Sequence, residues 1–260
     1  MGGVFERMQA TMERLGRATQ QAGREPSSVQ LLAVSKTFPP EAVLDAVRAG
    51  ARHFGENYVQ EGVDKIVRVD ERLRREFDHA APIVWHFIGP IQSNKTRDIA
   101  AAFDWVQSVD RARIAERLSA QRPPGRPALQ ICLQVNISGE ASKSGVTPEA
   151  GALLALALEV VKLPNLCLRG VMGIPAFEDD PARQRPPLAA LARLHRGLAD
   201  APELAAARGE GRCLIDTLSM GMSDDLEAAV LEGATQVRIG TAIFGARQAR
   251  ISAPPTAAAS

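Results

Sequence analysis

The segment LLAVSKTFPP, residues 31–40, consists of a short apolar run followed by a lysine and, three positions later, by two prolines. Its apolar run, 31–34, is typical of a fully buried strand, and Pro39 and Pro40 prevent that strand from continuing. Lys36 therefore stands at the carboxyl end of a buried strand. A lysine in that position either leaves the strand for solvent or is held in a pocket that the strand helps to form.

The same pattern recurs along the chain, because short apolar runs alternate with longer segments of helical periodicity. A first helix is expected at 4–22. Strands are expected at 30–35, 52–54, 84–88, 105–108, 129–136, 167–172, 214–218 and 236–239. Helices are expected between them at 40–49, 57–77, 94–102, 111–120, 148–162, 181–208 and 224–232. Strands that alternate with helices in this way predict an all-parallel α/β sheet.

Two architectures can hold such a sheet: a closed (β/α)8 TIM barrel of about 250 residues, and a doubly wound open sheet. The presence of eight strand-and-helix units and the absence of a GxGxxG motif after the first strand favour the barrel. We therefore predict a single barrel domain over 1–247, with an extra N-terminal helix and a disordered tail at 248–260. The Pro- and Arg-rich segments 121–127 and 178–187 are expected to be surface loops.

Composition narrows the classes of function. The 260 residues include 31 basic and 30 acidic side chains, a formal net charge of +1, so charge gives no indication of a nucleic-acid or membrane partner. No apolar run approaches the roughly 20 residues of a membrane helix, and no signal-peptide pattern is present. The 3 cysteines lie in apolar segments without metal-ligand spacing, which predicts buried free thiols in the cytoplasm.

In a barrel, the residues that follow each strand face one shared pocket. After the last two strands come SMGMSDD (219–225) and RIGTAIFG (238–245), which offer small and hydroxyl-bearing residues. Barrels often hold a phosphate group between these two loops, because closely approaching backbone N–H groups favour an anion. Ser223 taken alone could equally be a helix N-cap.

A phosphate site gives Lys36 a specific chemistry. A lysine held in a pocket loses hydration, its pKa falls, and its amine can form a Schiff base with an aldehyde. An aldehyde that also carries a phosphate could be pyridoxal 5′-phosphate or the sugar phosphate of an aldolase. Arg238 favours the former, because a guanidinium beside the pyridine nitrogen would keep that nitrogen unprotonated. The alternative for Arg238 is a salt bridge inside the barrel.

Seven stretches occur in an order and combination that resembles the pyridoxal phosphate homeostasis protein family. They are AVSKTFP (33–39), FGENYVQE (54–61), WHFIGPIQSNKT (85–96), VQSVDR (106–111), QVNISGEASKSGV (134–146), LRGVMGIP (168–175) and LSMGMSDDLEAAVLEGATQVRIGTAIFGAR (218–247). Together they span nearly the whole chain. Departures are local: Phe38 stands where lysine or glutamine is more usual, and Gly173 where alanine is more usual.

This resemblance implies a barrel similar to the N-terminal domain of bacterial alanine racemase, with pyridoxal 5′-phosphate as the cofactor. It implies a Schiff base on Lys36, pyridine-nitrogen contact from Arg238, and Asn57 close to both the lysine and the cofactor. The remaining residues that it implies are Ser223, Gly240 and Thr241 at the phosphate, and His86, Asn136 and Met220 lining the pocket. His86 could instead be a packed core histidine bonded to backbone, and Asn136 could instead satisfy a neighbouring loop.

The resemblance also bears on whether the protein is an enzyme. A racemase needs a second acid/base, which in the racemases is a tyrosine from an additional domain of a partner subunit. The only tyrosine here is Tyr58. We therefore expect a monomeric cofactor carrier that supplies pyridoxal phosphate to dependent enzymes, with a small amino-acid racemase as the alternative. Another lysine, such as Lys95 or Lys143, could hold the cofactor temporarily during transfer.

Overall fold

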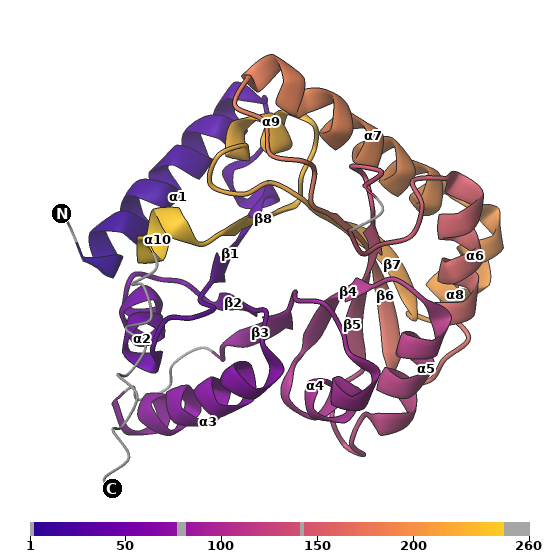
Figure 1. Ribbon diagram of the computed structural model, residues 1–260, viewed down its shortest axis with the longest axis horizontal. Coiled ribbons are helices and arrows are strands. Elements are labelled where there is room, and N and C mark those ends of the chain that lie inside the picture. Colours follow the sequence, from indigo (N-terminus) through magenta and orange to yellow (C-terminus); the bar gives the residue numbers. More distant parts are fainter. Residues whose placement is uncertain (1–2, 77–81, 141–142, 247–260) are drawn as a thin grey trace, which may run out of the picture.

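The computed structural model describes residues 3–76, 82–140 and 143–246. Eight parallel strands close into a barrel in sequence order, and helices surround it (Figure 1). The strands are β1 (Gln30–Val34), β2 (His53–Glu56), β3 (Val84–Phe87), β4 (Trp105–Val109), β5 (Leu129–Val135), β6 (Leu166–Gly173), β7 (Cys213–Ser219) and β8 (Gln236–Ile239). Pairing of β1 with β8, with Ala33 opposite Ile239, closes the sheet. The predicted barrel is confirmed, and the open sheet is excluded.

Helices cover the outside of the barrel (Figure 1). They are α1 (Val4–Gln21), α2 (Pro40–Arg48), α3 (Val59–Glu76), α4 (Thr96–Ala102), α5 (Ala112–Gln121), α6 (Ala150–Val160), α7 (Pro181–Asp200), α8 (Ala205–Gly209), α9 (Leu226–Leu231) and α10 (Thr241–Phe244), with short 3-10 turns at Pro26–Ser28, Ser93–Lys95 and Pro202–Leu204. The expected extra N-terminal helix is α1, and it packs against α9 and α10. In the described part of the chain, none of the helices combines the length and hydrophobicity that a membrane span requires.

Two local predictions between β6 and β7 are wrong. The helix expected over 181–208 ends at Asp200, because Pro202 disfavours helical geometry in the residue before it and Ala201 is extended, with ψ 117°. The loop expected at 178–187 is helical from Pro181, since Asp180 caps the helix by accepting the N–H of Ala182 at 2.9 Å. The tail at 248–260 lies outside the described residues.

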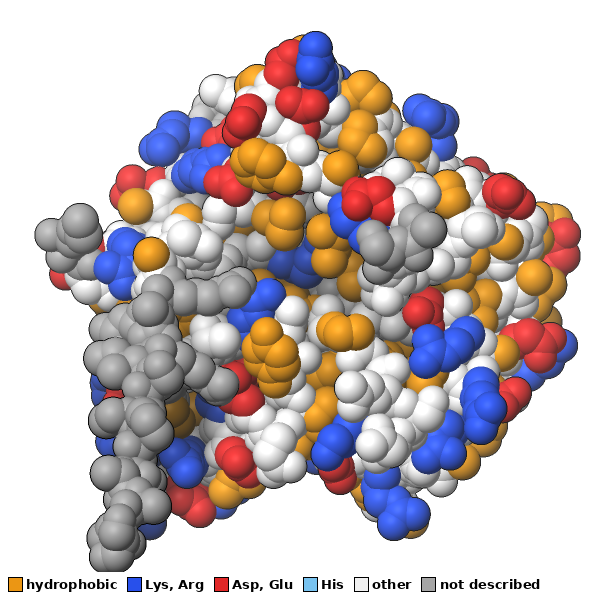
Figure 2. Space-filling view, viewed as in Figure 1, with side chains coloured by type: hydrophobic (Ala, Val, Ile, Leu, Met, Phe, Trp, Pro, Cys, Tyr) orange, Lys and Arg blue, Asp and Glu red, His pale blue; other side chains and the backbone are white. Residues whose placement is uncertain are grey.

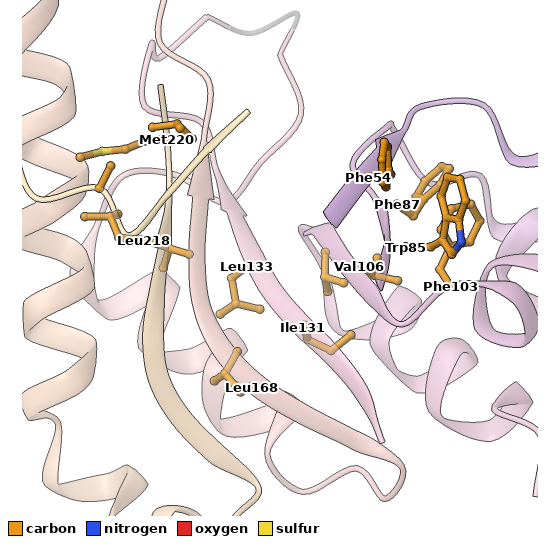
Figure 3. Close-up of a cluster of buried hydrophobic side chains, with 14 of the residues drawn as sticks. Phe54, Trp85, Phe87, Phe103, Val106, Ile131, Leu133, Leu168, Leu218 and Met220 are labelled. Atoms are coloured by element: carbon orange, nitrogen blue, oxygen red, sulfur yellow. The ribbon is translucent and has the colours of Figure 1, made fainter. Parts of the chain in front are cut away.

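The main apolar core lies between the strands and the outer helices, and an aromatic group forms one side of it (Figure 3). The rings of Phe54 and Trp85 lie 5.6 Å apart between centroids, and those of Phe87 and Phe103 lie 5.3 Å apart. The three cysteines are free and buried, as expected. Burial raises the pKa of the Cys132 thiol to about 12, so this thiol is protonated and unreactive at neutral pH.

The lumen of the barrel is unexpectedly polar, although branched apolar residues usually fill it. A closed ring of close polar contacts joins side chains from five strands: Gln30, His53, His86, Gln107 and Gln236. The two imidazoles are 3.0 Å apart between His53 Nδ1 and His86 Nε2. Gln107 Nε2 lies 2.5 Å from Gln236 Oε1 across the lumen, because β4 and β8 are not neighbouring strands.

The buried imidazole in this ring predicts a loss of stability in acid. Burial holds the pKa of His86 well below its ordinary value of 6.5. Because the unfolded chain takes up a proton there and the folded barrel does not, the free energy of unfolding falls as the pH drops below 6.5. We expect the difference in unfolding free energy between the wild type and His86→Gln to change by about 1.4 kcal/mol per pH unit, to the disadvantage of the wild type. Urea denaturation of both proteins from neutral to acid pH checks this, and parallel pH profiles would contradict it.

Candidate functional site

A tight turn carries Lys36 away from the end of β1. Ser35 O accepts the N–H of Phe38 at 3.1 Å, which closes the turn around Lys36 and Thr37. Thr37 has φ +68°, a conformation that β-branched residues rarely adopt and that costs about 1–3 kcal/mol. The turn brings the ring of Phe38 against Phe244 of α10, with centroids 5.2 Å apart. Lys36 therefore sits on a strained turn that packs against the last helix of the barrel.

The loops that follow β7 and β8 also converge at this edge. Ser223 Oγ accepts the N–H of Ala242 at 3.4 Å, which links the loop before α9 to the first turn of α10. Gly240 stands immediately before Thr241, and a Cβ at Gly240 would lie 3.4 Å from Val34 O at the end of β1. The geometry thus brings the three predicted phosphate residues beside the strand that leads to Lys36. Their contact with a phosphate stays a prediction.

Helix α1 supports both of these loops from outside the barrel. Arg14 donates to Ser223 O at 2.7 Å and pairs with both carboxylate oxygens of Glu227, at 2.6 and 2.5 Å. Arg7 donates to Ile243 O, in α10, at 2.7 Å. Our reading of the sequence missed this role. The only signal was a pair of arginines seven residues apart, which lie two turns apart on one helix face.

Arg238 is buried, with 4% of its surface exposed, and its hydrogen bonds go to neutral groups. Nη1 donates to Ser219 Oγ at 2.8 Å and Nη2 donates to Gly173 O at 2.9 Å. Within the described residues it forms no ion pair, so the alternative of a salt bridge inside the barrel is wrong. Burial lowers the pKa of Arg238 to about 10, and it therefore stays charged at neutral pH. The two bonds use two of five N–H donors, which leaves donors for a ligand.

Asn57 follows β2 at the same end of the barrel. Its Oδ1 atom is buried and has no hydrogen-bond partner within the described residues. The loop after β3 touches its backbone, because a Cβ at Gly89 would lie only 2.1 Å from Asn57 O. Ser108 fixes that loop by donating to Gly89 O at 2.6 Å. A buried acceptor without a partner is uncommon and fits a site that a ligand completes.

His86 lies inside the barrel, and the protein itself occupies both of its ring nitrogens. Its ring stacks on Trp105, with centroids 5.0 Å apart. This matches the expectation of a packed core histidine, except that its partners are side chains rather than backbone. Gln107 connects it onward, since Ser219 Oγ donates to Gln107 Oε1 at 2.7 Å and also accepts from Arg238. His86 thus reaches Arg238 through two intervening side chains.

The side chains of Asn136 and Met220 both contact other parts of the protein. Asn136 Nδ2 donates to Glu140 O at 2.8 Å and to Lys143 O at 3.1 Å, so its side chain holds the loop after β5. Met220 is fully buried within the main apolar cluster (Figure 3). Contact of these two side chains and of His86 with a ligand remains a prediction.

The face viewed in Figure 2 is hollowed at the centre of the barrel, and Lys and Arg side chains lie in the hollow. The chain as a whole is nearly neutral, so this is a local concentration of positive charge. A basic hollow suits a small anionic ligand.

Residues 8–248 match the family model of the alanine racemase N-terminal domain, so the fold and site define a barrel of that class. The pyridoxal phosphate homeostasis protein of Pseudomonas aeruginosa is 54% identical over 247 residues, which are 95% of this chain and 97% of the relative. The protein of the same name from Vibrio cholerae is 51% identical over 248 residues, which are 95% and 98% of the two chains. The structure of PipY from Synechococcus elongatus with pyridoxal phosphate bound is 33% identical, with a TM-score of 0.68 over 93% of this chain and 100% of that one. The chain therefore belongs to the family of pyridoxal phosphate homeostasis proteins, as its motifs indicated.

Proposed function

We propose that this protein binds pyridoxal 5′-phosphate at the mouth of its barrel, buffers it, and supplies it to pyridoxal phosphate-dependent enzymes. We further propose that it does so as a cytoplasmic monomer without robust catalysis of its own. Relatives at 51–54% identity are named as homeostasis proteins, and a relative at 33% identity has been solved with the cofactor bound. The observation that carries the proposal is the juxtaposition of the Lys36 turn with the loops of Ser223 and Gly240.

Each site residue then has a role toward the cofactor. The bound cofactor would supply a reactive aldehyde and an electron-accepting ring. The Lys36 amine would hold the aldehyde carbon as a Schiff base. The other roles are phosphate binding by Ser223, Gly240 and Thr241, contact with the cofactor by Asn57, and pocket lining by His86, Asn136 and Met220.

Arg238 would limit the chemistry that the cofactor can do. Its remaining N–H donors are available to a ring nitrogen, and a donor that stays protonated keeps that nitrogen unprotonated. An unprotonated ring is a weaker electron sink and stabilises a carbanion less. The only tyrosine of the chain, Tyr58, is 53% exposed, so no buried phenol can serve as the opposing acid/base. The lack of a buried phenol suits a carrier better than a racemase.

The carrier and racemase functions differ in what happens to an amino acid. The holo-protein incubated with L-alanine or L-serine in deuterated water is expected to exchange the α-proton no faster than free pyridoxal phosphate at the same concentration. Proton NMR follows the exchange, and chiral chromatography follows the D-isomer. Sustained formation of the D-isomer, proportional to protein concentration, would establish the racemase instead.

A further inference from the structure

We propose that Lys65 and Glu61, both on α3, are positioning residues that hold the two peptide groups on either side of Lys36. They face the turn from outside the barrel and are not expected to touch the cofactor. The inference rests on the proposed function, since it concerns the lysine that would carry the Schiff base.

The contacts are specific to the backbone of the turn. Lys65 Nζ donates to Ser35 O at 2.7 Å, and this carbonyl belongs to the peptide group before Lys36. Glu61 Oε1 accepts the N–H of Thr37 at 2.5 Å, and this amide belongs to the peptide group after Lys36. The two side chains also pair with each other at 2.9 Å, one helical turn apart. Lys65 and Glu61, which pair with each other, therefore bind the peptide groups on both sides of Lys36. We call these two side chains the clamp.

Lys65 is the buried member of this ion pair, whereas the Glu61 side chain is 29% exposed. The Lys65 side chain is 3% exposed, and its third hydrogen bond goes to Glu56 Oε1 at 2.7 Å. Ser35 Oγ donates to the same oxygen at 2.6 Å. The three N–H donors of the ammonium group thus each have one acceptor. A buried lysine with ionic partners contributes little net stability compared with an apolar residue, so the placement of Lys65 against the turn calls for another explanation.

The backbone of the turn supplies that explanation. Thr37 has φ +68°, a strained conformation for threonine that persists only when the surrounding structure holds it. Glu61 binds the N–H of this same residue. If the clamp residues are substituted, Thr37 can leave its positive φ, and the direction of the Lys36 side chain changes. A displacement of about 1 Å at a reacting group can reduce its effectiveness about a hundredfold.

The test compares Glu61→Ala, Glu61→Gln and Lys65→Met with the wild type. Absorbance titration gives the dissociation constant of pyridoxal phosphate, and mass spectrometry after borohydride reduction identifies the modified lysine. We expect Glu61→Ala and Lys65→Met to bind about tenfold more weakly, because hydrogen bonds to charged groups contribute about that factor. Glu61→Gln is expected to recover part of the loss, since its amide oxygen can still accept from Thr37.

Arg72→Met is the matched control, because Arg72 forms an exposed ion pair with Glu76 on the same helix at 3.0 Å and lies outside the clamp. It is expected to bind like the wild type. Thr37→Gly is expected to reduce the effect of Glu61→Ala, because glycine adopts a positive φ without strain. If Lys65→Met fails to fold, Glu61→Ala decides, since it keeps the buried pair with Glu56.

The outcomes separate this inference from the proposed function. If Glu61→Ala binds the cofactor like the wild type, on Lys36, the clamp is wrong and the proposed function stands. If the wild-type protein itself is modified on another lysine, the proposed Schiff base is wrong. A loss in Glu61→Ala that neither Glu61→Gln nor Thr37→Gly reduces would also overturn the clamp, because the loss would then be unrelated to the turn.

Discussion

Lys36→Ala is expected to abolish the visible absorbance of the pyridoxal phosphate complex and to leave the barrel folded. Alanine has no amine, so the aldehyde cannot be held covalently at this position. The fold should survive because Lys36 is half-buried on a turn and contributes no side chain to the apolar core. Substitutions of this kind change the free energy of unfolding by roughly 0.5 kcal/mol or less. Absorbance spectroscopy and urea denaturation measure the two quantities.

Lys143→Ala is the matched control for this experiment. Lys143 pairs with Glu140 in the loop after β5, and it is one of the lysines that could hold the cofactor temporarily. Its loss is expected to leave the absorbance at equilibrium unchanged. If instead Lys36→Ala keeps the full absorbance, the Schiff base lies elsewhere and the proposed site is wrong.

Gly89→Ala is expected to affect both stability and the site. A Cβ at Gly89 would lie 2.1 Å from Asn57 O, a backbone atom that cannot move aside without moving the loop after β2. Forcing an extra carbon into such a contact costs about 3 kcal/mol. The same movement shifts Asn57, which we place beside the cofactor. We therefore expect a lower free energy of unfolding in urea and weaker pyridoxal phosphate binding in the same variant.

Gly197→Ala distinguishes this effect from a general effect of adding a methyl group. Gly197 lies on the exposed face of α7, and a Cβ there would meet nothing within 4 Å. Alanine is the better helix former, so this variant is expected to gain up to about 1 kcal/mol and to bind the cofactor like the wild type. Wild-type stability and binding in Gly89→Ala would show that the two loops do not meet as described.

The barrel could be predicted from sequence because the patterns that indicate its strands and helices are local. Each apolar run and each helical period is read over a few residues, and eight such units specify the closed sheet. The convergence of Ser223 and Gly240 near Lys36 follows from the same rule, since the carboxyl ends of parallel strands share one face. The break before α8 was missed because the helical periodicity of 181–208 outweighed the signal of Pro202.

Contacts between distant parts of the chain could not be predicted in this way. Gln107 and Gln236 lie 129 positions apart, and only the register of the closed barrel brings them together. The neutral partners of Arg238 depend on the same register. Lys65 looks like any helical lysine in the sequence, where the usual expectation is solvent exposure. Its burial becomes evident only when α3 is packed against the turn of Lys36.

The central claim is that one amine, on Lys36, holds the cofactor. Borohydride reduction of the holo-protein followed by proteolysis and mass spectrometry locates the modified residue directly. We predict a single pyridoxyl group on Lys36 in nearly every molecule. A group found mainly on Lys65, Lys95 or Lys143, or no modification at all, would contradict the account.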